Sequence, residues 1–158
     1  MVGAHGRALP DGHRGKRAVM DMMSSPMMAM LDKEMPGMDM MMMQQCIESC
    51  SACEQSCTMC ADMCASSGME GMARCMAMCM DTADMCHATM RMMMRPSGMD
   101  AAVMMQVLEA CMMMARACAE ECMKHDDTEH MKACAQVCMD CAKACESMMG
   151  SMRMMMAR

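Results

Sequence analysis

The sequence predicts an all-α protein: an antiparallel four-helix bundle with a cysteine-lined core and an N-terminal extension that is disordered or partly helical. Two observations predict this fold. Four segments, each of about 22 to 28 residues, lack proline and are separated by short turn-forming runs. Within each segment, cysteines recur three or four residues apart, which is the spacing of residues on one face of a helix.

Turn-forming residues set the limits of the four segments. Pro36-Gly37 precedes the first segment, and Ser66-Ser67-Gly68 ends it. The second ends at Arg95-Pro96-Ser97-Gly98, and His125-Asp126-Asp127-Thr128 separates the third from the fourth. Because the connections are short, we expect consecutive helices to pack as antiparallel neighbours in one domain of residues 39–156.

The residues within the segments favour helix. Ala, Met, Glu, Gln and Cys dominate, and β-branched residues are few. Asp100 and Thr128 stand where N-caps are needed, and Asp39 is a weaker candidate for the first helix.

The N-terminal region has a different composition. Residues 1–17 are basic and rich in Gly, with almost nothing to bury, and predict a disordered tail. Residues 18–38 predict a short helix or linker. Residues 18–31 have some features of a secretion signal, but Asp21 and Pro26 interrupt the apolar run and no small-residue cleavage site follows. We therefore expect a cytoplasmic protein with reduced cysteines, and a degenerate export signal is the alternative.

Composition excludes several functions. The net charge is −6 and no Phe, Tyr or Trp is present, so the chain offers neither a basic field nor stacking rings for nucleic acid. Polar residues interrupt every methionine run, so we expect no membrane partner. The carboxylates lie off the cysteine faces and no histidine is placed to activate one particular thiol, so we expect no enzyme.

All four predicted helices place cysteines at positions that face the bundle axis. The first helix is the most regular, with cysteines alternately four and three residues apart. The candidate metal ligands are Cys46, Cys50, Cys53, Cys57, Cys60 and Cys64 in the first segment, Cys75, Cys79 and Cys86 in the second, Cys111, Cys118 and Cys122 in the third, and Cys134, Cys138, Cys141 and Cys145 in the fourth. A core of small thiols would leave voids along the axis, so we expect metal to occupy that space.

The chemistry of the ligands favours Cu(I). Seven pairs have the spacing Cys-x-x-x-Cys, and thiolates one helical turn apart can bind a two-coordinate ion from both sides. Soft thiolate and thioether ligands select Cu(I), which also accepts three sulfurs, so thiolates could bridge multiple ions along the bundle. A metallothionein-like module for Zn(II) or Cd(II) is the alternative. A disulfide scaffold fits less well, because partners on one helix resist a relaxed S–S bond.

The two bundle ends differ in their predicted residues. One end collects Met43, Met93, Met104 and Met152, and the other collects Met69, Met72, His125, His130 and Met131. A packed plug and a thioether-lined entrance are both open for the methionine end. At the other end, we predict that His125, His130 and Met131 are ligands at the copper entrance, with solvated surface histidines as the alternative. His87 is expected only to border the core.

The cysteine-lined helices also carry a family resemblance. The Cys-x-x-x-Cys ladder, Glu-Glu-Cys-Met-Lys-His at 120–125 and Glu-His-Met-Lys-Ala-Cys at 129–134 resemble the cytosolic copper storage proteins, over roughly residues 44–149. The resemblance implies a bundle whose cysteine interior holds many Cu(I) ions, commonly in a homotetramer. A copper chaperone or a small thiol is the expected donor.

The chain departs from the family pattern at three positions. Thr82, Ala115 and Met131 stand where such proteins tend to carry further cysteines. The resemblance therefore implies a lower capacity or altered sites at these positions. Methionine also replaces the family's Leu, Ile and aromatic residues on the outer core, with 40 Met in 158 residues.

Overall fold

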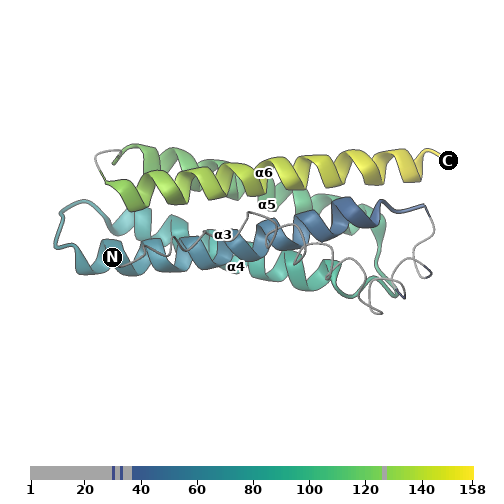
Figure 1. The fold of residues 1–158 in the computed structure, drawn as a ribbon, viewed down its shortest axis with the longest axis horizontal. Coiled ribbons are helices and arrows are strands. Elements are labelled where there is room, and N and C mark those ends of the chain that lie inside the picture. Colours follow the sequence, from purple (N-terminus) through teal and green to yellow (C-terminus); the bar gives the residue numbers. More distant parts are fainter. Residues whose placement is uncertain (1–29, 31–32, 34–36, 126–127) are drawn as a thin grey trace, which may run out of the picture.

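Four antiparallel helices form one elongated bundle in the computed structural model, which describes residues 30, 33, 37–125 and 128–158 (Figure 1). The helices are α3 (Met40–Ser66), α4 (Ala73–Met93), α5 (Ala101–Met123) and α6 (Glu129–Met156). Each helix packs against the next in sequence, and α6 closes the bundle by packing against α3. The predicted fold class is confirmed. The tail expected at 1–17 and the helix or linker expected at 18–38 lie almost wholly outside the described residues.

Two aspartates cap helices as expected. The Asp39 carboxylate accepts a hydrogen bond from the Met42 backbone N–H at 3.0 Å, although Asp39 was the weaker candidate. Asp100 Oδ1 accepts hydrogen bonds from the backbone N–H groups of Ala102 and Val103 at 2.9 and 3.0 Å. Thr128 occupies the N-cap position of α6 with an extended backbone. These side chains fix where α3 and α5 begin, and therefore the register of their cysteines.

The corner between α3 and α4 depends on two glycines. The Ser67 hydroxyl donates to the Cys64 carbonyl at 2.8 Å and ends α3. Gly68 and Gly71 then adopt φ values of +67° and +78°, in the left-handed region that favours glycine. The resulting turn carries Met69 and Met72 past the end of the bundle and leads into α4.

The methionine end of the bundle is closed by packing. Met43, Met93, Met104 and Met152 are all buried, where α3 and α5 begin and α4 and α6 end (Figure 1). Thr89 of α4 is also buried, whereas the neighbouring Met90 is only partly buried. The Thr89 hydroxyl donates a hydrogen bond to the Met85 carbonyl at 2.7 Å, so this buried polar group has a hydrogen-bond partner.

One described helix has the length and composition of a membrane span. The apolar helix α5 meets both criteria. In this structure it packs between α4 and α6, and core helices of bundles reach the same composition.

Candidate metal centre

A continuous column of thiols fills the bundle axis. All sixteen cysteines are free and buried, and none exposes more than 2% of its surface. Neighbouring Sγ atoms lie 3.5 to 4.0 Å apart. Cys57 illustrates the density: its Sγ is 3.5 Å from that of Cys138 and 3.9 Å from those of Cys118 and Cys134. All sixteen residues chosen from the sequence therefore lie in the buried interior, and all but Cys53 and Cys75 belong to groups that one ion could reach.

The thiols form groups with ligand atoms within 4.8 Å of one another. The groups are Cys46, Cys50 and Cys145; Cys50, Cys86, Cys111 and Cys141; Cys57, Cys118, Cys134 and Cys138; Cys60, Cys79, Cys122 and Cys134; and Cys60, Cys64 and His130. Two of the four-cysteine groups draw one thiol from each helix. Three of the Cys-x-x-x-Cys pairs, Cys46/Cys50, Cys60/Cys64 and Cys134/Cys138, each fall within one group, and every group also draws a ligand from another helix. Cys50, Cys60 and Cys134 each belong to two groups.

A layer with less sulfur divides the column near its middle. At this level α4 and α5 contribute Thr82 and Ala115, both fully buried. The Thr82 hydroxyl donates to the Met78 carbonyl at 2.6 Å and so does not face the axis as a free donor. The groups on either side of this layer share no cysteine.

Cys53 links the two sides. Its Sγ is 3.7 Å from that of Cys138 and 3.9 Å from that of Cys57. Hydrogen bonding with the Cys138 thiol on one side and the Cys141 thiol on the other lowers the pKa of Cys53. This thiol therefore connects the two halves of the column across the Thr82 layer.

Crowding separates the thiols into easily and poorly ionised ones. Hydrogen bonding with the Cys145 and Cys50 thiols lowers the pKa of Cys46 to about 5. Burial, together with the charges of Cys60 and Cys75, raises the pKa of Cys64 to about 12. A first thiolate is stabilised by neighbouring S–H donors, while each further one meets burial and repulsion. A cation that binds thiolates throughout the column must therefore displace protons.

The three residues predicted at the copper entrance differ in their burial and in their contact with the thiols. His130 joins the metal-binding geometry: its Nε2 is 3.7 Å from Cys64 Sγ, and it lines a groove of about 170 Å³ with Met59, Met63 and Cys60. His125 is half-buried at the end of α5, where its backbone N–H donates to the Cys122 carbonyl at 3.1 Å. Met131 is fully buried.

His87 lies on the outer surface. Its Nδ1 is 2.9 Å from the Glu54 carboxylate, and nearly half of its side chain is exposed. It takes no part in the thiol groups among the described residues.

Sequence reasoning missed Glu121. This carboxylate is buried, and it accepts hydrogen bonds from Arg74 Nε at 3.0 Å and Lys124 Nζ at 2.7 Å. The hydrogen bond from Lys124, supported by Arg74, lowers the pKa of Glu121. The pair with Arg74 ties α4 to α5 beside Cys75 and Cys122, whose Sγ atoms are 3.8 Å apart. The i,i+3 spacing of Glu121 and Lys124 was the available signal.

Comparisons with known proteins agree on one family. The sequence model of the copper storage protein family matches residues 39–150. No match is found among curated proteins. A solved structure of the copper storage protein Ccsp from Streptomyces lividans, loaded with 10 copper equivalents, is 37% identical with a TM-score of 0.73, over 79% of this chain and 98% of that one.

Two further structures from Streptomyces lividans are similar. A histidine-to-alanine variant of Ccsp is 39% identical with a TM-score of 0.71, over 73% of this chain and 98% of that one. A cytosolic copper storage protein with five coppers is 40% identical with a TM-score of 0.68, over 69% of this chain and 92% of that one. With its bundle matched by the family's sequence model and its cysteines gathered inside, the chain belongs to the copper storage protein family.

Proposed function

We propose that this protein stores copper as multiple Cu(I) ions bound by thiolates along the bundle axis. The observation that carries the proposal is the column of sixteen buried thiols with sulfur atoms 3.5 to 4.0 Å apart. Thiolates about 2.3 Å from a shared ion lie at such separations in three- or four-coordinate sites. Soft sulfur ligands without competing oxygen ligands favour Cu(I).

A Zn(II) or Cd(II) store is the second candidate. Three groups contain four cysteines, the number that tetrahedral Zn(II) uses. Cu(I) is the better fit because Cys50 and Cys134 are each shared between two groups, and one group has three cysteines only. Two- and three-coordinate ions bridged by shared thiolates match that arrangement.

An anaerobic titration tests the stored metal. Reduced protein titrated with Cu(I) against a competing chelator should bind roughly half to one ion per cysteine, since each ion takes two or three sulfurs and bridging thiolates are shared between ions. Loading should release protons, because thiols such as Cys64, with a pKa raised to about 12, are protonated at neutral pH. Binding should weaken as pH falls. Saturation at one or two equivalents, or stoichiometric Zn(II) binding that Cu(I) does not displace, would refute Cu(I) storage.

We also propose that copper enters at the end with His125, His130 and Met131. The contact between His130 and Cys64 supports this route, since a neutral imidazole can hold Cu(I) beside the outermost thiols and release it inward. The opposite end is sealed by buried methionines.

Removing the histidines should slow loading without reducing capacity. We expect His125→Ala/His130→Ala to take up Cu(I) about tenfold more slowly in stopped flow, because even the loss of groups that only support a metal site costs about ten- to a hundredfold in affinity or activity. His87→Ala is the matched control, since His87 is held by Glu54 away from the thiols. Unchanged uptake in the double variant, with slower uptake in Met43→Leu/Met104→Leu, would place the entrance at the other end.

We also propose a cytoplasmic location for the protein. The cytosolic relative supports this location, and a reducing compartment would keep the thiols free to bind metal. The donor that we propose is a copper chaperone or a small thiol. We also propose a homo-oligomer, a tetramer by the family resemblance, with storage as its role and no catalytic activity.

A further inference from the structure

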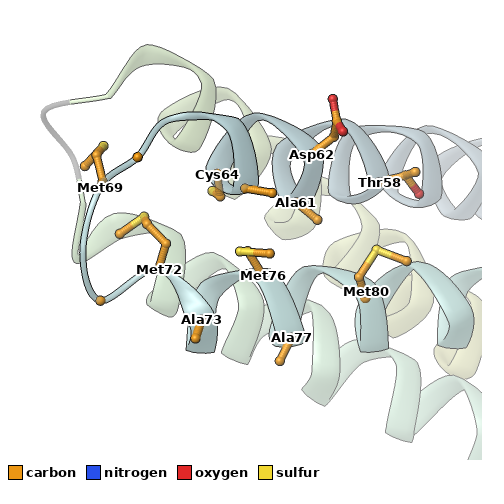
Figure 2. A pocket seen from close by; sticks show the side chains of 13 residues that line it. Thr58, Ala61, Asp62, Cys64, Met69, Met72, Ala73, Met76, Ala77 and Met80 are labelled. Atoms are coloured by element: carbon orange, nitrogen blue, oxygen red, sulfur yellow. The ribbon is translucent and has the colours of Figure 1, made fainter.

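A methionine-lined groove runs between α3 and α4 beside the histidine end of the bundle (Figure 2). Its volume is about 900 Å³. Sulfur atoms line it from four thioethers and one thiol, those of Met69, Met72, Met76, Met80 and Cys64. The entrance proposed above uses none of these methionines.

The groove is open because its remaining walls are small. Ala61 and Ala65 line the α3 side, Ala73 and Ala77 line the α4 side, and Gly68 and Gly71 line the corner. A Cβ added at either glycine would meet nothing within 4 Å. Methionine stripes on a helix usually pack into a core. Here the small residues opposite leave the methionines around a hollow.

The sulfur atoms lead from solvent toward the thiol column. Met69 and Met80 are 39% and 43% exposed, whereas Met72 is 4% exposed. Figure 2 shows Met72 and Met76 directed into the space between α3 and α4, near Cys64. Cys64 is itself in the group with Cys60 and His130. The groove thus reaches one outer thiol, that of Cys64, from the side of the bundle.

The lining favours a soft cation over other ligands. Thr58 and Asp62 are the polar residues among those that line the groove, and Asp62 points away from it in Figure 2. The lining residues therefore supply neither a basic group for an anion nor a set of oxygen ligands for a hard cation. Thioethers are neutral, soft ligands that bind Cu(I) without losing a proton.

We propose that this groove is a thioether site for Cu(I) and a second route into the store, delivering the ion to Cys64. The inference rests on the proposed Cu(I) storage function. Thioethers hold Cu(I) less tightly than thiolates do, so an ion bound at Met69 or Met80 moves inward as stronger ligands become available. Because the route uses no imidazole, it operates in parallel with the histidines.

Uptake kinetics in a histidine-free background test the second route. Starting from His125→Ala/His130→Ala, the four groove methionines are replaced by leucine, which keeps their volume and removes the sulfur. We expect stopped-flow uptake of Cu(I) to fall by about a further tenfold, with unchanged final capacity. The matched control replaces four exposed or peripheral methionines elsewhere by leucine: Met41, Met94, Met113 and Met154.

The possible results separate the two proposals. Full capacity with equal uptake in the groove and control variants would overturn the groove site and leave storage intact. Saturation of the unsubstituted protein at one or two equivalents would overturn storage itself. The quadruple variant could lose its helical circular dichroism. In that case the uptake rate is measured in Met69→Leu/Met80→Leu, which changes only the two exposed positions. An uptake rate equal to that of a control with two of the other exposed methionines replaced would overturn the groove site.

Discussion

Copper loading is expected to raise the unfolding temperature of the bundle by tens of degrees while its helical content stays nearly constant. An ion that binds only the folded state adds about 4 kcal/mol at a thousandfold excess over its dissociation constant, and several sites add together. About 1 kcal/mol shifts the unfolding temperature of a domain of this size by several degrees. Circular dichroism melts of reduced protein, with and without Cu(I), measure both quantities.

The helices themselves should not need metal. Asp39 and Asp100 cap α3 and α5, and the methionine end is already packed. Stripping copper with a chelator should therefore return the protein to its lower unfolding temperature and keep the helical spectrum. A metal-free protein that is mostly coil would contradict this and would make copper part of the fold, as zinc is in a zinc finger.

Replacing the three shared cysteines should reduce copper capacity more than replacing any three cysteines of one group. Cys50, Cys60 and Cys134 together belong to all five groups, so Cys50→Ala/Cys60→Ala/Cys134→Ala removes a ligand from each. We expect the loss of bound copper to be roughly twice that of the control, because removing a thiol shared by two groups weakens both of them, so the effects of replacing single cysteines do not simply add. Alanine keeps helix propensity, so the bundle should remain folded.

The control removes the same number of thiols from one group. Cys86, Cys111 and Cys141 belong only to the group that they form with Cys50. Anaerobic Cu(I) titrations of the two triple variants, with circular dichroism as the check on folding, give the comparison. Equal losses in the two variants would show that each thiol contributes independently and that the shared positions have no special role.

The sequence was sufficient to predict the helices and the inward-facing cysteines, because both depend on local spacing. The run from Cys46 to Cys64 follows one face of a helix whatever surrounds it. Asp100 could be recognised as a cap for the same reason. The family resemblance also rested on spacing, and the family match over residues 39–150 confirms it.

Contacts between helices could not be predicted from the sequence. The contacts of Cys57 with both Cys134 and Cys138 depend on the axial shift of α6 against α3, which the loop lengths do not fix. The burial of Glu121 depends on Arg74 reaching it from α4. The groove depends on small residues of two helices facing one another, and neither helix shows that alone.

If copper enters at the histidine end as proposed, the layer at Thr82 and Ala115 would give the store an order of filling. Ions that arrive at that end first meet the eight cysteines that form groups on that side and reach the others past Cys53. The eight are Cys57, Cys60, Cys64, Cys79, Cys118, Cys122, Cys134 and Cys138. Under the proposed route, the near half is a working pool that exchanges readily with donors. The far half is a reserve, filled last and emptied last.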